Sequence, residues 1–334
     1  MTRDEAPLLT DLLRDVSRSF YQTLRLLPGR VRGPISLAYL LARATDTVAD
    51  TELVPVPERL IALDRLRRRI LGERPKRLEF GDLAARQADE AERVLLTRIE
   101  EAITALEALP GLERGLVREV LRTITSGQML DVRRFAGAGI HAVRALATEA
   151  ELDDYTYRVA GCVGEFWTDL CRTRLFPRTQ LDDDRLRRDG VRFGQGLQLV
   201  NILRDLPRDL RQGRCYLPAD ALDALGLTAV DLLDPDNEPR LRPVYQHWLH
   251  RAQGRLAAGW RYTLVLPWRQ VRVRLACAMP VLIGVRTLRL LEAGNPLDPD
   301  VRLKIPRAEV KRLLRQAVLR YPVPSWWAAL GPQP

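Results

Sequence analysis

Apolar residues recur at helical spacing along most of this 334-residue sequence. Between positions 91 and 109, Leu95, Ile99, Ile103 and Leu106 follow one another at steps of four, four and three, which places them on one face of a helix. Similar stripes occur on either side of this segment: Leu60, Leu63, Leu66 and Ile70, and Val117, Val120, Leu121 and Ile124. We find no convincing run of alternating β-branched residues bounded by hairpin turns. The sequence therefore predicts an all-α protein.

The breaks between the helical segments are short, and none has the length or polarity of a domain linker. They fall at residues 72–77, 135–140 and 233–243. The pair Thr148 and Glu151 has the spacing of a capping box, which predicts the start of another helix. No internal repeat is visible, so we expect one multi-helix domain over residues 1–334, with its core at about 8–295 and a basic C-terminal segment at about 296–334.

The sequence argues against a membrane-spanning protein and against a zinc or redox motif. It contains no stretch of eighteen uncharged apolar residues, and its N-terminus lacks the apolar region of a signal peptide. The four cysteines, Cys162, Cys171, Cys215 and Cys277, form no CxxC pair. A reduced cytoplasmic setting fits this pattern best, with peripheral contact at the inner face of a membrane left open.

The net charge of +10 admits three classes of partner: nucleic acid, an anionic membrane surface, or a small anion. Of the 53 basic residues only Lys76, Lys304 and Lys311 are lysines. An arginine-biased genome explains that preference, but it does not explain where particular arginines lie. A helical nucleic-acid-binding protein therefore stays as an alternative that rests on charge alone, because no helix-turn-helix, zinc-finger or RNP motif is visible.

The first chemical signal is a pair of aspartates, Asp46 and Asp50, spaced i, i+4 so that they share one helix face. The segment before them, ISLAYLLARAT, is apolar enough to belong to a core helix. Two carboxylates emerging from a core helix need a partner that neutralises them, since buried unpaired charge is unfavourable. A divalent cation such as Mg²⁺, which prefers carboxylate oxygens and shares its shell with phosphates, would serve.

A second pair, Asp205 and Asp209, has the same spacing and lies on an otherwise apolar segment. Gln198 and Asn201 fall on nearly the same face, and Arg204 stands beside it. One helix with such a row of polar residues could simply expose them to solvent. Two separate core helices that each carry a DxxxD motif favour a common function for the two motifs. Mg²⁺ held by both could bind a diphosphate and stabilise it as a leaving group, with arginines gripping the remaining phosphate oxygens. An apolar bundle interior would suit a hydrocarbon tail.

The motifs of this chain, in their order and spacing, resemble those of the squalene/phytoene synthases. The resemblance covers most of the chain and rests on SRSF (17–20), YLLARATDTVAD (39–50), YTYRVAG (155–161), and LQLVNILRDLPRD with GRCYLP (197–218). It implies an all-α isoprenoid synthase fold with a central apolar cavity. It also implies a prenyltransferase that joins two prenyl diphosphates head to head.

The resemblance implies a role for each matching residue. Mg²⁺, and through it diphosphate, would be bound by Asp46, Asp50, Asp205 and Asp209. Direct contacts to phosphate oxygens would come from Arg43, Arg204 and Arg214. The diphosphate end of the site would be lined by Ser17, Ser19 and Tyr39, while Gln198 and Asn201 would help to place substrate or metal. Tyr155 matches the family tyrosine that assists proton removal when the cyclopropane intermediate forms, although a core tyrosine is its plain structural reading.

Two departures from the family pattern concern the acidic motifs. Many members carry a further acid where this chain has Thr51 and Arg208. Pro207 also lies inside the second motif, where it removes a helix hydrogen bond and disfavours helical geometry at Leu206. On this basis Asp209 is expected to lie past a kink.

The resemblance leans towards squalene synthase, which forms presqualene diphosphate from two farnesyl diphosphates and reduces it with NADPH. Residues 275–291 and 301–314 resemble the late core helix and the following basic stretch of bacterial squalene synthases, which makes Lys304 and Arg307 the candidates for NADPH binding. Phytoene, dehydrosqualene and presqualene diphosphate synthases, which perform no reduction, stay as alternatives. So does a catalytically silent, membrane-associated partner of other isoprenoid enzymes.

Three further clusters of residues can be explained without a catalytic role. The acidic stretch at 181–189 fits the start of a helix, where carboxylates complement the helix dipole. His247 and His250 lack an evident third ligand for a metal. Trp326 and Trp327 would either contact a membrane interface or cover an apolar patch. The partners expected from the sequence are thus prenyl diphosphates, and no stable protein partner is evident.

Overall fold

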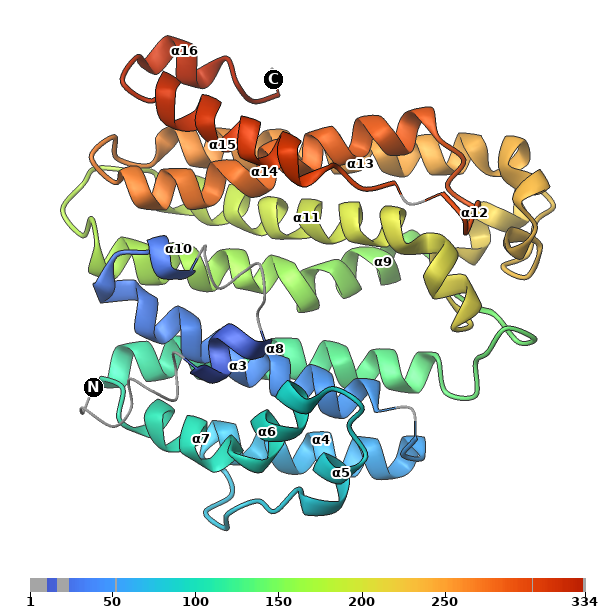
Figure 1. The fold of residues 1–334 in the computed structure, drawn as a ribbon, viewed down its shortest axis with the longest axis horizontal. Helices are drawn as coiled ribbons and strands as arrows, with labels where there is room; N and C mark the ends of the chain where they lie inside the picture. Colours follow the sequence, from blue (N-terminus) through green and yellow to red (C-terminus); the bar gives the residue numbers. More distant parts are fainter. Residues whose placement is uncertain (1–10, 17–23, 52, 302, 333–334) are drawn as a thin grey trace. The chain divides into compact units, whose positions relative to one another are not determined.

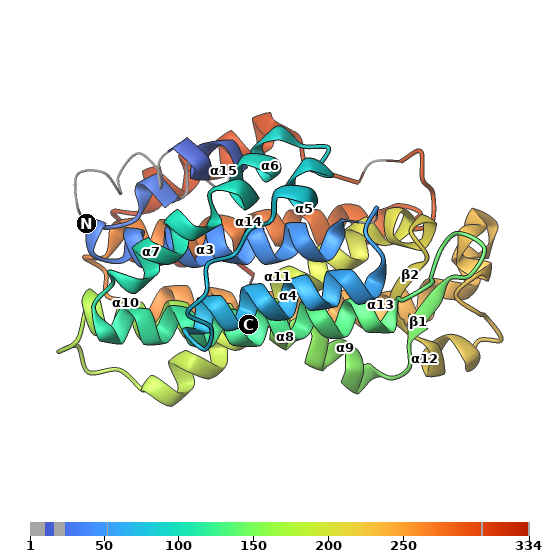
Figure 2. The ribbon, with the colours of Figure 1, turned by 90° about the horizontal axis from the view of Figure 1, so that it is seen from below.

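The computed structural model describes residues 11–16, 24–51, 53–301 and 303–332 of the chain (Figure 1). It is 73% helical, which confirms the all-α prediction. Within the described ranges the strands are β1 (Arg144–Leu146) and β2 (Arg214–Pro218), which pair in parallel (Figure 2). These strands are too short to produce a periodic pattern, and the sequence did not reveal them. In the part of the chain that the structure describes, no helix is long and apolar enough to cross a membrane.

The chain divides into two compact units. The first comprises Met1–Arg133 and Phe166–Arg178, and the second comprises Arg134–Glu165 and Thr179–Pro334. The single domain and the central apolar cavity expected from the sequence stay predictions.

The first unit is built from helices whose ends follow local sequence signals. Its elements are α3 (Gly29–Asp50), α4 (Val56–Leu71), α5 (Gly81–Ala85), α6 (Glu90–Thr97), α7 (Ile99–Glu107), α8 (Gly111–Arg134) and most of α10 (Cys162–Arg174). Helix α4 begins after Pro55 and ends at Gly72, whose φ of +78° is a left-handed conformation that glycine adopts without strain. The predicted stripe from Leu95 to Leu106 is buried, but a break at Arg98 divides it between α6 and α7.

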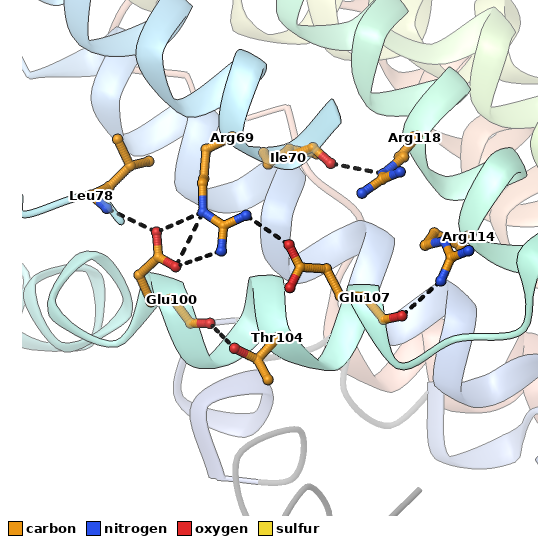
Figure 3. A network of polar contacts seen from close by, with 8 residues as sticks. All are labelled: Arg69, Ile70, Leu78, Glu100, Thr104, Glu107, Arg114 and Arg118. Carbon is orange, nitrogen blue, oxygen red and sulfur yellow. Dashed lines mark hydrogen bonds and ion pairs between the residues drawn. The ribbon is translucent and has the colours of Figure 1, made fainter. Parts of the chain in front are cut away.

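A buried arginine ties α4 to α7 in this unit (Figure 3). Arg69, whose side chain is 9% exposed, donates from Nη1 to Glu107 Oε1 (2.7 Å) and from Nη2 to Glu100 Oε2 (3.0 Å). Glu100 also accepts from the backbone N–H of Leu78 (2.9 Å). The charge of Arg69 is thus matched by carboxylates that are themselves hydrogen-bonded, as a buried cation requires.

The second unit has the long helix α11 (Asp183–Arg211) running alongside α13 (Glu238–Val265) and α14 (Val271–Ala293) (Figure 1, Figure 2). Its other elements are α9 (Glu149–Thr156), the π-helical turn η1 (Tyr157–Gly161), β1, β2, α12 (Ala219–Asp223), the 3₁₀ turns η2 (Asp231–Leu233) and η3 (Pro235–Asn237), α15 (Arg307–Arg320) and α16 (Pro324–Ala328). The predicted helix starts are confirmed: Thr148 Oγ1 accepts from the N–H of Glu151, and Asp182 caps α11 by accepting from the N–H of Arg185.

Two glycine contacts bring α11 against the segment that follows α9. A Cβ atom at Gly164 would lie 2.0 Å from the carbonyl oxygen of Gly190, and one at Gly194 would lie 2.1 Å from that of Ala160. Both distances are far below van der Waals contact with a rigid backbone. Because glycine has no side chain, Gly164 and Gly194 allow the two backbones to approach this closely. They therefore help to set the register between the two segments and the position of the second acidic motif on α11.

Candidate active site

The first acidic motif lies at the C-terminal end of α3. As predicted, the preceding residues form a core helix, with Ile35, Leu37, Leu40, Leu41 and Ala44 buried. The side chain of Asp46 is 42% exposed, and Asp50, the last residue of the helix, is exposed. The motif therefore stands where a core helix reaches accessible surface.

Arg43 pairs with the first acidic motif. Its Nη1 donates to Asp46 Oδ2 at 2.7 Å, and its Nη2 pairs with Glu92 of α6. The Nε atom of Arg43 is buried and has no hydrogen-bond partner among the described residues. A buried donor without a partner is unusual in a folded protein, and it marks a position where an anion oxygen would be stabilised.

The electrostatic environment of α3 disfavours the charge on Asp46. Desolvation and the carboxylate of Asp50 raise the pKa of Asp46 to about 6, although Arg43 acts to lower it. Burial beside the core residues of α3 and the like charge of Asp50 together cause this rise, although 42% of the side chain is exposed. The pKa of Tyr39 is raised as well, mainly by burial. A cation bound beside Asp46 and Asp50 would relieve the repulsion.

The second acidic motif lies on α11, which runs without interruption through Pro207 to Arg211. Asp205 and Asp209 therefore belong to one helix, and the kink expected at Pro207 stays a prediction. Proline removes one backbone donor, but Leu206 and Leu210 are both 1% exposed within the hydrophobic core. Their burial on the same helix offsets the lost hydrogen bond.

The polar residues of α11 form the stripe predicted from their spacing. Gln198, Asp205 and Asp209 are half-buried and Asn201 is exposed, whereas Leu199, Val200, Ile202, Leu203 and Leu206 are buried. Arg204 binds the carboxylate of Asp205 in bidentate fashion, from Nε to Oδ1 (2.8 Å) and from Nη2 to Oδ2 (2.6 Å). These hydrogen bonds raise the pKa of Arg204 further. Asp205 is thus already paired with a guanidinium group.

Tyr155 packs against strand β2, on which Arg214 lies. Tyr155, on α9, stacks on Tyr216 with ring centroids 4.7 Å apart and planes inclined by 23°. Arg214 and Tyr216 are two residues apart on β2, and alternate strand residues point to the same side. Asp209 belongs to the same region, because its charge contributes to raising the pKa of Cys215 to about 12, which is mainly an effect of burial.

Asp153 holds the helix that carries Tyr155. Its carboxylate accepts from Arg255 Nη2 (2.6 Å) and Arg251 Nη2 (2.8 Å), both on α13. The backbone oxygen of Asp153 accepts from Gln195 Nε2 of α11 (3.3 Å). The position of Tyr155 relative to α11 and α13 therefore depends on this network.

The sequence reading did not single out Glu92, Asp153 or Tyr216. The partners of Asp153 lie 98 and 102 residues away, and Arg43 and Glu92 lie 49 residues apart. No local spacing signals such contacts. An acid two residues before Tyr155 and an aromatic residue two after Arg214 were the only available hints.

The last predicted site residues belong to the C-terminal segment or lie outside the described ranges. Lys304 is exposed ahead of α15, and Arg307 is exposed as its first residue. Ser17 and Ser19 lie outside the described residues. The roles of all these residues stay predictions.

The donor set of both acidic motifs fits Mg²⁺. This ion takes oxygen ligands from one or two carboxylates and completes its octahedron with waters and phosphate oxygens. Across residues 11–16, 24–51, 53–301 and 303–332, no group of three or more Asp, Glu, His or Cys side chains forms a complete cage by itself. Each acidic pair could contribute carboxylates to such an ion: Asp46 with Asp50 on α3, and Asp205 with Asp209 on α11.

Known proteins resemble this chain over most of its length. A presqualene diphosphate synthase from Rhodopseudomonas palustris is 29% identical over 90% of this chain and 93% of its own length. The Botryococcus squalene synthase of Botryococcus braunii is 29% identical over 90% of this chain and 61% of its own length. The solved structure of TcSQS with the ligand E5700 superposes with a TM-score of 0.78 at 20% identity, covering 98% of this chain and 92% of that one, and so shares the fold.

Residues 13–309 match the family model for squalene/phytoene synthases, which is most of the chain. The motifs quoted above all lie within this span. The chain therefore belongs to the squalene/phytoene synthase family, whose members are prenyltransferases of isoprenoid biosynthesis that couple prenyl diphosphates head to head.

Proposed function

We propose that this protein couples two farnesyl diphosphates head to head, forming presqualene diphosphate and releasing one diphosphate and one proton. The observation that carries the proposal is the repeated pairing of an acidic motif with an arginine. Arg43 binds Asp46 on α3, and Arg204 binds Asp205 on α11. Two such helices suit two diphosphate groups. The named activity of the Rhodopseudomonas palustris relative, which matches over nearly its full length, supports the choice of product.

The arginines would bind the phosphate oxygens directly. Arg43 already uses two of its nitrogens on carboxylates, and a phosphate oxygen would satisfy its buried Nε. Mg²⁺ bound at each acidic pair, Asp46 with Asp50 and Asp205 with Asp209, would supply the charge neutralisation that makes diphosphate a good leaving group.

Tyr155 would accept the proton that is lost as the cyclopropane ring forms. A tyrosine hydroxyl has an ordinary pKa near ~10, so it acts as a base only beside a group that stabilises its anion. Arg214 is the candidate for that group, because it shares one side of β2 with Tyr216, on which Tyr155 stacks. Asp153, through Arg251 and Arg255, would keep Tyr155 in place.

Product analysis by mass spectrometry tests the proposal. Farnesyl diphosphate with Mg²⁺ should give presqualene diphosphate, and Asp205→Asn should lower the rate by at least ~100-fold because charge stabilisation at the leaving group is lost. Asp184→Asn, an exposed position in the first turn of the same helix, is the matched control and should keep the wild-type rate. Turnover of geranylgeranyl diphosphate alone would move the substrate to the longer chain. Failure to turn over either compound would refute the proposal.

A second candidate activity is reduction of presqualene diphosphate to squalene by NADPH. The observation in its favour is that Lys304 and Arg307, three positions apart at the start of α15, are both exposed and so accessible to a phosphate group. With NADPH added, squalene should replace presqualene diphosphate. The double substitution Lys304→Gln/Arg307→Gln should raise the KM for NADPH while the coupling rate stays unchanged. An unchanged product in the presence of NADPH would exclude the reductive step.

We also propose that the protein works in the cytoplasm. Its four cysteines are buried free thiols, as expected in a reducing compartment. Fractionation of cells that produce the chain should recover it with cytoplasmic or inner-membrane material, and recovery from an oxidising compartment would contradict this.

A further inference from the structure

Exposed basic and exposed apolar side chains both occur on the adjoining helices α15 and α16. On α15, Lys311, Arg315 and Leu319 follow one another at steps of four and are all exposed, on the side opposite the buried Leu313 and Ala317. Arg312 and Val318 flank this row, and Trp326 is exposed on α16. We call these six residues the basic–apolar face: Lys311, Arg312, Arg315, Val318, Leu319 and Trp326.

The apolar side chains of this face are largely exposed to solvent. Leu319 is 78% exposed, Trp326 is 62% exposed and Val318 is 49% exposed, whereas the neighbouring Trp327 is fully buried. Of the two uses expected for the tryptophan pair, Trp327 covers an apolar patch and Trp326 stays accessible. Three large exposed apolar side chains on two adjoining helices indicate a surface that binds an apolar partner.

The face is held firmly on the second unit. Trp327 Nε1 donates to the carbonyl of Ala317 (3.0 Å), and Trp260 Nε1 donates to the carbonyl of Ala328 (3.0 Å). The guanidinium of Arg274 lies over the rings of Trp268 (4.7 Å) and Trp327 (4.6 Å). The inner side of α15 and α16 thus packs against the rest of the second unit. None of these contacts involves a residue of the basic–apolar face.

The charge of this region is strongly asymmetric. From Val301 to the end of the sequence there are seven basic residues and one acid, a net charge of +6 against +10 for the whole chain. The single acid, Glu309, is shared between Arg312 (3.3 Å) and Arg286 (3.6 Å). An excess of positive charge is left on the outer side, where only a negatively charged partner complements it.

We propose that the basic–apolar face docks the protein on an anionic lipid bilayer. Lys311, Arg312 and Arg315 would contact the lipid headgroups, while Leu319, Val318 and Trp326 would enter the boundary between headgroups and acyl chains. Tryptophan is favoured at that boundary because it presents an apolar ring and a polar N–H. A nucleic acid would match the charge but would leave Leu319 and Val318 in water. A second copy of the face would oppose like charges.

The size of the effect follows from the charges and apolar groups that make contact. Each basic residue near an anionic membrane contributes about 1 kcal/mol, or roughly fivefold in partitioning. Lys311→Gln/Arg315→Gln should therefore weaken binding by roughly 25-fold at low salt, and less at high salt because the attraction is screened. Leu319→Gln/Trp326→Gln should weaken binding by about tenfold or more, and this loss should persist at high salt because burial of apolar surface is not screened.

Flotation of the full chain with lipid vesicles tests the proposal. The protein should float with vesicles containing phosphatidylglycerol and stay behind with pure phosphatidylcholine. Two control variants change exposed residues elsewhere: Ile61→Gln/Leu112→Gln in the first unit and Arg185→Gln/Arg188→Gln on α11. Both should float like the wild type. Circular dichroism melting checks that every variant is folded.

Several outcomes would overturn the proposal. Equal flotation with neutral vesicles, or no flotation at all, would remove the lipid partner. Flotation that the two face variants do not reduce, while the controls do, would move the contact to another surface. Binding of a single- or double-stranded oligonucleotide that depends on the face, with vesicles unaffected, would replace lipid by nucleic acid. A face-dependent dimer in sedimentation analysis without vesicle binding would replace it by a second copy of the chain.

Discussion

Replacing Asp46 with asparagine should make the protein more stable in the absence of divalent cations. The pKa of Asp46 is about 6 in the folded chain against 3.8 ordinarily, so folding disfavours its ionised form. A group whose pKa is raised on folding contributes its stability below the ordinary pKa and loses it as the pH rises through the folded value. At neutral pH the charged Asp46 therefore lowers the free energy of unfolding.

The magnitude follows from the same shift. A change of two pKa units corresponds to about 3 kcal/mol in a site closed to water. Because the side chain of Asp46 is 42% exposed, solvent screening reduces this to about 1 kcal/mol. Asparagine keeps the shape and removes the repulsion with Asp50. Arg43 still pairs with Glu92, so that no cation is left unpaired.

Urea unfolding at pH 7.5 with a metal chelator, followed by circular dichroism, measures this difference. Asp46→Asn should gain about 1 kcal/mol over wild type, the gain should shrink as the pH falls from 6 towards 4, and added Mg²⁺ should stabilise wild type more than the variant. Asp300→Asn, an exposed aspartate away from the motifs, should change neither quantity. A variant that is less stable than wild type at pH 7.5, or a gain that does not depend on pH, would refute the reasoning about the acidic pair.

Two further predictions concern the packing that positions the site. Glu100→Gln should lower the free energy of unfolding by about 3 kcal/mol, because Arg69 would keep its buried charge with one fewer carboxylate, and urea denaturation measures this. A decrease in the free energy of unfolding below about 0.5 kcal/mol would mean that water already solvates the charge of Arg69. Gly164→Ala should destabilise the fold by about 1–3 kcal/mol, since its Cβ would lie 2.0 Å from the carbonyl of Gly190, and it should slow coupling by shifting α11. Thermal melting with kinetics at a permissive temperature checks both effects, and a wild-type melting temperature would contradict the close contact.

The helices and the two acidic motifs were predictable because their signals are local. A stripe such as Leu95, Ile99 and Ile103 arises when one face of a helix is buried, so burial is written directly into the spacing. The same holds for the capping residues Thr148 and Asp182, whose side chains bond to N–H groups three residues away. The i, i+4 spacing of Asp46 and Asp50 likewise needs only a helix to put both on one face.

Tertiary structure decided which residues each of these side chains contacts. The course of α11 through Pro207 depends on the burial of Leu206 and Leu210, a term that outweighs the local preference of proline. The pairing of Arg43 with Glu92, and of Asp153 with Arg255, joins residues 49 and 102 positions apart.

The sequence by itself therefore determined which helices form and which residues they carry to the site, because helical periodicity and capping are properties of neighbouring residues. The packed chain alone decided which charges are paired, which aromatic ring Tyr155 stacks on, and that Trp327 is buried while Trp326 faces outward. These outcomes depend on contacts between segments that are distant in the sequence, for which local spacing carries no information.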